Sequence, residues 1–256
     1  MCVDHTADDH TRAWAFALID QQPPASEDGI VDWLSRLCRA ASQEVDVIAA
    51  TVTMGAPGDT SAVVAASAPG NQRFAETEYA VGEGPANDAW MLRRPVLVPE
   101  LGGPQDGAWP GYTATATADG VVAVFAFPLQ VGAVRVGVFT LYHDEPGTLS
   151  PANLATCLLM AELATERLVD SHASDGGAID PSLEAAADVR MEIYQAQGMV
   201  AVALEISLVD ALATLRGHAF QSGRDLIDVA SEIVHNGYRL GDDRHDRNHE
   251  QDRDQE

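Results

Sequence analysis

The stretch VVAVFAFPLQVGAVRVGVFTLYH, residues 121–143, decides the fold of this chain. It holds two runs rich in valine and phenylalanine, Val121–Gln130 and Val134–His143, which are separated by a short loop that contains a glycine. β-Branched and aromatic residues on both sides of such a loop are typical of a β-hairpin. We therefore predict two neighbouring strands here, within a larger sheet.

The residues upstream of this hairpin predict a helix and a second hairpin. Apolar residues over Ser26–Glu44 recur at helical spacing. Two β-rich runs follow at Val45–Met54 and Ala62–Ala68, and Gly55–Asp59 supplies the turn between them. A shorter helix is expected before this region, in the segment that contains Trp14.

The segment between the two hairpins opens with Gly82-Glu83-Gly84-Pro85. Proline is favoured at the first position of a helix, so we predict a helix over Ala86–Leu92, followed by a short strand at Val96–Pro99. A long helix over Ser150–Asp170 closes the region. The predicted order is helix, hairpin, helix with a small strand, hairpin, helix.

This order and several of its motifs resemble GAF domains over roughly residues 26–170. The motifs are Gly82–Ala86, Pro95–Val98, Trp109, Phe127–Leu129, Val136–Val138 and Leu141-Tyr142. The resemblance implies a mostly antiparallel sheet flanked by helices, and a pocket that binds a small-molecule ligand in some relatives. Trp109, Glu83 and Asp88 are the candidate ligand-binding residues. Position 86 and its neighbours hold no cysteine, so we expect no covalently bound bilin and no other cofactor.

The candidate ligand residues also have plain structural interpretations. Gly82–Pro85 could be only a tight connection into a helix, and it lacks the lysine and serine of a phosphate-binding loop. Trp109 could cap the core of the domain rather than line a pocket. Glu83 and Asp88 do not have the spacing of a catalytic carboxylate pair, so we expect no enzyme activity.

Three apolar patterns of helical period follow one another between Ala186 and Asn236. The first repeats at alternating steps of three and four residues, through Ala186, Val189, Ile193, Ala196, Val200 and Ala203. The second begins at Ser207, with Asp210 as its capping-box partner, and the third starts at Leu226. These patterns predict a small three-helix bundle. The first stripe could be the core of that bundle or the seam of a coiled-coil dimer.

The bundle resembles the ANTAR family of RNA-binding antitermination domains. The matching residues are Tyr194–Val200, Ile206-Ser207, Asp210-Ala211, Leu215-Arg216, Ala219, Leu226, Val229-Ala230 and Ile233-Val234. The resemblance implies a homodimer that binds paired hairpins in nascent RNA and keeps a terminator from forming, without a metal or a catalytic residue. The family commonly has a lysine where this chain has Gln197.

Candidate RNA-binding residues lie in the first two helices of the bundle, because cationic side chains hold phosphates and amides read base edges. They are Arg190, Gln195, Gln197, Arg216, His218, Gln221, Ser222 and Arg224. The alternative for the arginines is pairing with Asp210, Asp225 or Asp228 on the surface of the bundle.

The charge of the chain opposes RNA binding at long range. Its 39 acidic residues outnumber 15 basic ones, all of them arginine, and the net charge is −24. Such a field repels phosphates, so any RNA contact requires a local cationic patch. No apolar run is long enough to cross a bilayer, and the acidic segment Met1–His10 is unlike a secretion signal, so we expect no membrane contact and a cytoplasmic protein.

We therefore predict an N-terminal segment over residues 1–25, a GAF-like sensor over 26–170 and a linker over 171–181. An ANTAR-like domain over 182–240 and a disordered acidic tail over 241–256 follow. His245 and His249 in the tail have metal-ligand spacing, but almost no apolar residue anchors a helix there, so we expect no metal. The expected function is RNA-binding antitermination controlled by a sensed signal. The alternative is a protein-interaction or small-molecule sensor module that does not bind RNA.

Overall fold

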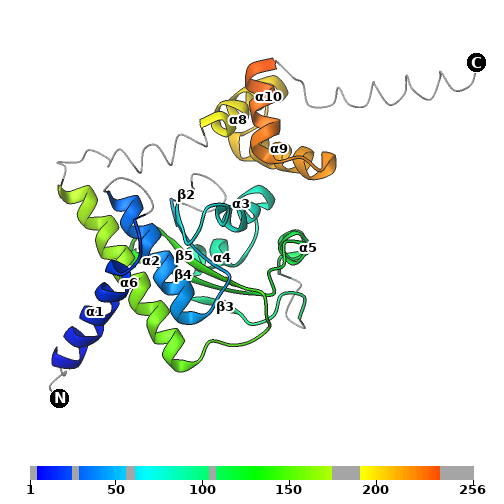
Figure 1. Ribbon diagram of the computed structural model, residues 1–256. Helices are drawn as coiled ribbons and strands as arrows, with labels where there is room; N and C mark the ends of the chain where they lie inside the picture. Colours follow the sequence, from blue (N-terminus) through cyan, green and yellow to red (C-terminus); the bar gives the residue numbers. More distant parts are fainter. Residues whose placement is uncertain (1–4, 25–28, 56–60, 104–107, 175–190, 237–256) are drawn as a thin grey trace, which may run out of the picture. The chain divides into compact units, whose positions relative to one another are not determined.

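A computed structural model describes residues 5–24, 29–55, 61–103, 108–174 and 191–236. The chain divides into two compact units, residues 1–188 and 189–256, which we call the N-terminal and C-terminal units (Figure 1). Each unit is described by itself.

The N-terminal unit is built on a five-stranded sheet in the order β2-β1-β5-β4-β3, in which all neighbours are antiparallel. The strands are β1 (Ala49–Met54), β2 (Ala62–Ala66), β3 (Val96–Val98), β4 (Ala123–Val131) and β5 (Val134–His143). The predicted hairpin is confirmed, and β5 has the bounds expected from the sequence. β4 and β5 pair along their whole length, with Phe127 opposite Phe139.

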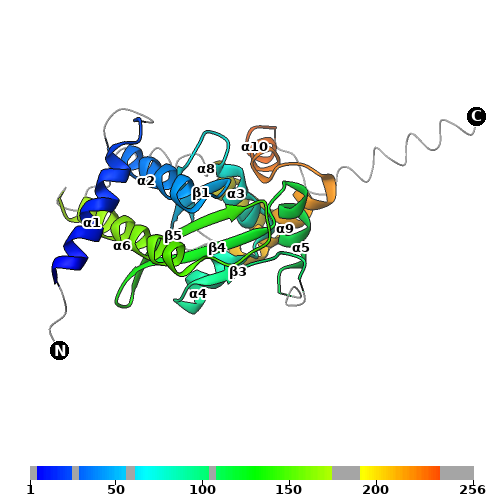
Figure 2. The ribbon, with the colours of Figure 1, turned by 60° about the horizontal axis from the view of Figure 1, so that its bottom comes forward.

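In the described part of the N-terminal unit, helices cover both faces of this sheet. The helices there are α1 (His5–Asp20), α2 (Ile30–Val45), α3 (Gln72–Val81), α4 (Pro85–Leu92), α5 (Pro110–Ala118) and α6 (Pro151–Ser174). Of these, α1 packs on α2 and α6. Successive strand residues point to opposite faces, so Phe139 and Leu141 join the core under α2 and α6, whereas Tyr142 joins the core on the other face. Figure 2 shows α2 and α6 lying along one face of the sheet.

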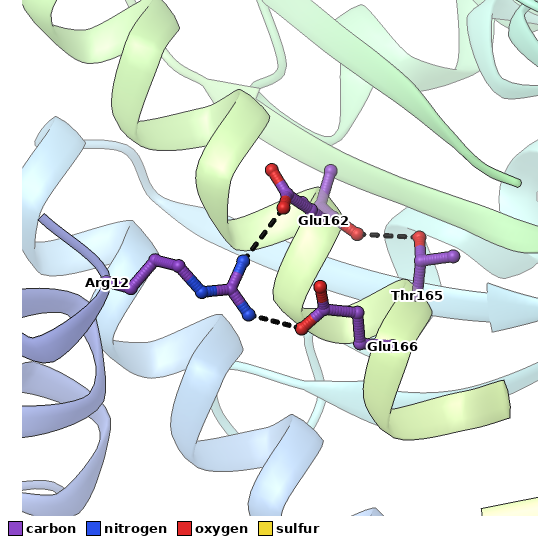
Figure 3. Close-up of polar contacts among 5 residues, drawn as sticks. Arg12, Glu162, Thr165 and Glu166 are labelled. Carbon is purple, nitrogen blue, oxygen red and sulfur yellow. Dashed lines mark hydrogen bonds and ion pairs between the residues drawn. The ribbon is translucent and has the colours of Figure 1, made fainter. Parts of the chain in front are cut away.

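Helix α1, which the sequence suggested was a minor segment, is part of the packed N-terminal unit. Ala15 and Ile19 are fully buried in the core shared with α2 and α6. Arg12 donates to Glu162 at 2.8 Å and pairs with Glu166, so that one guanidinium joins α1 to two successive turns of α6 (Figure 3). Surface ion pairs stabilise a fold by about 1 kcal/mol or less, so the buried residues contribute most of this attachment and Arg12 sets its orientation.

Two helices, α3 and α5, were not predicted. The buried stripe of α3 contains Phe74 and Tyr79 but also a glutamate, Glu78. Because a charged residue interrupts the apolar repeat, the sequence pattern did not indicate a helix. The α5 segment reads PGYTATATA, an alternation typical of a strand. Tyr112 and Ala116 lie one helical turn apart and are both buried, so tertiary packing favours a helix there.

Some element boundaries differ from the prediction. α2 continues to Val45 and ends at Asp46, which has a left-handed φ of 59°, so β1 begins four residues later than Val45. α6 continues to Ser174, so the first residues of the predicted 171–181 linker are helical. The rest of that linker, the 241–256 tail with its two histidines and most of the predicted 55–59 turn lie outside the described residues.

Residues 191–236, the described part of the C-terminal unit, form three packed helices, α8 (Met191–Leu204), α9 (Leu208–Ser222) and α10 (Leu226–Asn236). Three residues of the predicted stripe, Ile193, Ala196 and Val200, are buried core within this unit, whereas Ala203 is exposed and Ala186 and Val189 lie outside the described residues. The predicted cap of the second helix is present: the Ser207 hydroxyl accepts a hydrogen bond from the Asp210 backbone N–H at 3.1 Å. That hydroxyl also donates to the Asp210 carboxylate, which therefore does not reach back to the backbone as in a full capping box.

Helices α8 and α9 are apolar beyond the core they share. Their exposed large apolar residues are Met191, Met199, Val202, Leu204, Leu208, Val209 and Phe220. In the part of the chain that is described, no single helix could span a membrane, although α8 and α9, which meet at a 105° bend, pass as a broken pair by length and composition alone.

Gly137 offers a test of the sheet register. It lies on β5 opposite Met54, and a Cβ atom there would collide with the Thr53 carbonyl oxygen on β1. We expect Gly137→Ala to lower the free energy of unfolding by about 1–3 kcal/mol, because backbone rather than a flexible side chain would have to move. Urea denaturation measures this change.

The matched control is Gly147→Ala, because a Cβ atom at Gly147 meets nothing within 4 Å. This variant should stay within about 0.5 kcal/mol of the parent. Equal stabilities for the two variants would contradict the β1–β5 pairing.

Candidate functional site

The face of the sheet covered by α3 and α5 carries the candidate sensor site. Phe74 of α3 stacks on Tyr142 of β5 with ring centroids 5.2 Å apart. Tyr112 of α5 is fully buried in the same cluster. The cluster therefore lies between the sheet and two helices, α3 and α5, and includes three aromatic side chains.

Glu78 is an ionisable group beside this cluster, close enough for its charge to act on Tyr112 and Tyr142. It lies on α3 and is 3% exposed, and its carboxylate accepts hydrogen bonds from the backbone N–H groups of Ala86 (2.6 Å) and Asn87 (3.0 Å). These N–H groups belong to the first turn of α4 and would otherwise lack partners. A carboxylate is also favourable at the positive end of a helix dipole. Glu78 thus holds the start of α4 against α3.

Gly84 makes this contact possible. It precedes α4 at a φ of 151°, and a Cβ atom there would overlap the Glu78 carboxylate. Only glycine leaves the space for the carboxylate to reach the helix N-terminus.

Burial changes the acidity of the groups in this cluster. Desolvation raises the pKa of Glu78 to about 8, against the opposing effect of the hydrogen bonds from Asn87 and Ala86; the charge of Asp88 raises it further. The pKa values of Tyr112 and Tyr142 are also raised, first by burial and then by the neighbouring Glu78 charge. The tyrosines therefore stay neutral, whereas Glu78 changes charge near neutral pH.

The cluster contains an unused hydrogen-bonding group. The Tyr112 hydroxyl is buried and has no hydrogen-bond partner among the residues that the structure describes, whereas the Tyr142 hydroxyl lies 3.5 Å from Thr51 Oγ1. A buried hydroxyl without a partner costs roughly 1–3 kcal/mol.

The predicted ligand residues lie beside this cluster but have structural contacts. Glu83 accepts hydrogen bonds from the backbone N–H groups of Gly111 (2.7 Å) and Tyr112 (3.3 Å), so it caps α5 as Glu78 caps α4. Trp109 precedes α5 and packs against the aromatic cluster while partly buried. Asp88 lies in the first turn of α4 and is partly exposed.

Sequence reasoning missed Glu78 and Tyr112, the two groups that define the interior. A glutamate within a helical segment is ordinarily solvated. The available signal was its position six residues before the Gly84-Pro85 helix start, at a helical spacing of four from Phe74.

Two of the predicted RNA-binding residues have contacts within the C-terminal unit. Gln197 is 7% exposed, and its Nε2 donates to the Leu208 carbonyl at 2.7 Å, so it ties α8 to the start of α9. Arg224 pairs with Glu232 of α10 at 2.6 Å. Both side chains therefore have partners inside the unit.

The remaining candidates lie on different sides of the helices. Residues two apart on a helix are roughly 200° apart around its axis, so Arg216 and His218 point to opposite flanks of α9. Ser222 lies on the His218 flank, and its hydroxyl donates to the His218 carbonyl at 2.7 Å. Gln195 is exposed on α8, Gln221 is exposed on α9, and Arg190 lies outside the described residues.

The charge of the described part of this unit is negative. Residues 191–236 contain two arginines, Arg216 and Arg224, and six acidic residues. The long-range field at this surface therefore opposes a phosphate backbone, as the composition of the whole chain predicts.

A family model described as a GAF domain matches residues 28–169. The search of curated proteins found no match. Among solved structures, the GAF domain of an Acinetobacter phosphoenolpyruvate-protein phosphotransferase is 10% identical with a TM-score of 0.48, covering 68% of this chain and 99% of that one. A domain of a putative two-component sensor histidine kinase from Sinorhizobium meliloti is 16% identical with a TM-score of 0.46, covering 59% of this chain and 100% of that one. The chromophore-binding domain of a bacteriophytochrome from R. palustris is 11% identical with a TM-score of 0.47, covering 68% of this chain and 64% of that one.

The raised pKa of Glu78 predicts a pH dependence of stability. The folded state holds this proton up to about pH 8, whereas the unfolded chain releases it near 4.5. The Glu78 contribution to stability is therefore fully present below pH 4.5 and is lost as the pH rises through 8. Glu78→Gln keeps an oxygen that can accept both N–H bonds and should flatten this decline in urea denaturation between pH 5 and 9.

The matched control is Glu76→Gln, which removes an exposed carboxylate from the same helix. It should retain the slope of the parent protein. If Glu78→Gln declines as steeply as the parent, Glu78 does not titrate in the folded state as its burial implies.

Proposed function

Since the chain belongs to the GAF domain family, we propose that it is a cytoplasmic, non-enzymatic regulator in which residues 28–169 sense a signal and control an RNA-binding C-terminal unit. GAF domains are commonly signal-sensing parts of regulators. The RNA-binding part of the proposal comes from the ANTAR resemblance of residues 182–240, which implies binding to paired hairpins in nascent RNA. Sensing then acts through a difference in ligand affinity between two conformations.

The observation that supports the sensor role is the buried interior around Glu78 and Tyr112. It offers a small ligand the Tyr112 hydroxyl, which lies in an aromatic cluster and has no hydrogen-bond partner among the described residues, and the carboxyl group of Glu78 beside that cluster. Both groups belong to helices that cover one face of the sheet. Glu78 holds the start of α4, so a ligand that bonds to it competes with the Ala86 and Asn87 contacts. Ligand binding would then be read out as a shift of α4.

The RNA-binding role draws on the C-terminal unit. Its second helix starts at the Ser207–Asp210 cap, one of the motifs that carry the ANTAR resemblance. Arg216 supplies the cationic group on α9, and the exposed amides of Gln195 and Gln221 can hydrogen-bond to bases. A homodimer would place two such units on the two hairpins, which raises the effective concentration of the second contact.

A protein-interaction module is the second candidate function. It is favoured by the internal contacts of Gln197 and Arg224, two of the residues expected to touch RNA. The exposed apolar residues of α8 and α9 favour it as well, because an apolar surface recruits protein rather than phosphate.

Titration with a dual-hairpin RNA at several salt concentrations tests the RNA-binding role. We expect binding that weakens with salt, and Arg216→Ala should lower the affinity about tenfold and reduce the salt slope by about 1, as for loss of one phosphate contact. Fluorescence anisotropy of labelled RNA measures both quantities.

The matched control is Arg94→Ala, which removes an exposed arginine from the N-terminal unit. It changes the net charge equally and should leave the affinity within about twofold of the parent. If the parent protein does not bind the RNA at low salt, or if both variants weaken it equally, the RNA-binding role is wrong and the protein-interaction role is favoured.

A further inference from the structure

The outer edge of β3 is exposed on the N-terminal unit. β3 is the last strand of the sheet and pairs with β4 on one side only. α4 covers one face of the sheet beside it, where Val96 packs against the core that contains Trp90. Among the described residues no strand lies on the other side of β3, so the backbone groups on that side are open to an added strand.

Cationic side chains gather at the start of this edge. Arg93 and Arg94 follow directly after α4, are exposed, and form no ion pair with any residue that the structure describes. Arg135 reaches the same place from β5, because its Nη1 donates to the Trp90 carbonyl at 2.8 Å and its guanidinium lies 4.6 Å from the Trp90 ring centroid. The end of a helix favours a cation, which accounts for Arg135. Two further guanidinium groups remain for an acidic group from outside.

The segments that carry these three arginines contain no acidic residue. Neither residues 89–99 nor residues 121–143 include an aspartate or a glutamate, although the chain as a whole has 39. In a protein with a net charge of −24, such segments favour a local cationic surface. An anionic partner is attracted at this edge and repelled elsewhere, which restricts where it binds.

Exposed apolar side chains accompany the arginines. Met91, near the end of α4, is 70% exposed, and Leu97 of β3 is 42% exposed. The β4–β5 turn adjoins them, because Gln130 Nε2 donates to the Arg93 carbonyl at 3.2 Å, and Val131 beside it is 55% exposed. We define the β3 edge patch by six exposed residues: Met91, Leu92, Arg93, Arg94, Leu97 and Val131. An anion without apolar parts, such as inorganic phosphate, would leave half of this patch uncovered.

We propose that the β3 edge patch binds an extended peptide segment of another protein. The segment adds to β3 as a further antiparallel strand, places acidic residues beside Arg93 and Arg94, and packs apolar residues on Leu97 and Met91. This surface belongs to the N-terminal unit and is distinct from the exposed apolar residues of α8 and α9. It depends on neither the sensor role nor the RNA-binding role.

The two faces of the sheet suit an added strand. Leu97 is opposite Phe125, which belongs to the core under α2 and α6, whereas α4 lies on the other face. Successive side chains of a strand point to opposite faces, so alternate residues of the segment reach Leu97 and the end of α4. β3 has only three residues between Pro95 and Pro99, and proline donates no backbone hydrogen bond. Few backbone bonds are therefore available, and the side chains decide which segment binds.

The charge along this edge changes sign, which sets the direction of the segment. The two arginines precede β3, whereas Glu100 follows it and is exposed. Residues 144–149 include two acidic residues and reach the same end, since the Gly147 N–H donates to the Pro99 carbonyl at 2.8 Å. A complementary strand is therefore acidic at one end and cationic at the other. All strand pairs of this sheet are antiparallel, so the acidic end is the C-terminal end of the segment.

Synthetic peptides and the full chain test this chemistry. The probe has about eight residues: a lysine at its N-terminal end, alternating valine and threonine in the middle, and two glutamates at its amidated C-terminal end. Fluorescence anisotropy of the labelled peptide measures its dissociation constant. Replacing the glutamates by glutamines should raise this constant about tenfold, because two charge-assisted contacts are lost.

Backbone methylation tests the pairing with β3. Two further peptides carry N-methyl groups on alternate residues, one on the odd positions and one on the even positions. Only every second N–H of an edge strand points to its neighbour. One methylated peptide should therefore lose binding, and the other should keep it, although the two have the same side chains.

Charge reversal tests the position of the site. Arg94→Glu should raise the dissociation constant of the probe at least about tenfold, and it should bind a peptide with two lysines in place of the glutamates more tightly than the parent protein does. The matched control is Arg73→Glu, an exposed position on α3, which packs against β1 and β2 at the opposite side of the sheet. It changes the net charge equally and should stay within about twofold of the parent. Thermal unfolding verifies that both variants are folded.

Several results would overturn the proposal. Absence of probe binding at low salt, or equal weakening by Arg94→Glu and Arg73→Glu, would exclude a site at this edge. The same behaviour of both methylated peptides would exclude strand addition, and tighter binding of the peptide with reversed sequence would exclude the antiparallel direction. Displacement of the probe by the dual-hairpin RNA would assign the patch to RNA, and Arg94→Ala would then weaken RNA binding as well. Failure of the RNA-binding role leaves the peptide measurements unaffected.

Discussion

The hydrogen bonds from α4 to the Glu78 carboxylate organise one whole face of the N-terminal unit. Glu78 receives two backbone N–H groups of α4, and Glu83, five residues later, receives two of α5. Three helices are therefore joined by two carboxyl groups, one on α3 and one within the Gly82–Pro85 turn. The cost is a charge that the protein interior disfavours, which is why Glu78 retains its proton to an unusually high pH. The Gly82–Pro85 segment, which the sequence suggested as part of a ligand site, therefore has a structural role in positioning α4 and α5.

The elements that could be predicted from the sequence are those in which the apolar residues follow one clear repeat, of a strand or of a helix. β4 and β5 alternate between two buried faces and contain many β-branched residues, so local propensity and burial agree. α3 and α5 were missed because a buried carboxylate and a threonine-alanine alternation obscure their periods. Glu78 and Tyr112 could not be recognised in advance, since their importance arises from burial and from backbone groups contributed by other elements.

In the C-terminal unit, helical periodicity predicted which residues form the core, but not whether each polar side chain points into the unit or toward solvent. Gln197 lies in a motif expected to face RNA, yet its amide bonds to Leu208 at the α8–α9 bend. A sequence pattern shows which side of a helix a residue occupies only if one side is apolar. Both sides of α8 and α9 are apolar in part, so polar residues among them could turn inward or outward.

The attachment of α1 affects how the chain can be shortened. Ala15 and Ile19 belong to the core of the N-terminal unit, and Phe16 lies against Trp33 with ring centroids 6.4 Å apart. A chain trimmed to begin at residue 26, as the family boundary near residue 28 invites, would uncover that tryptophan and part of the helical layer beside it. The trimmed protein would expose apolar surface to solvent and tend to precipitate, although its sheet and the residues around Glu78 and Tyr112 would be complete.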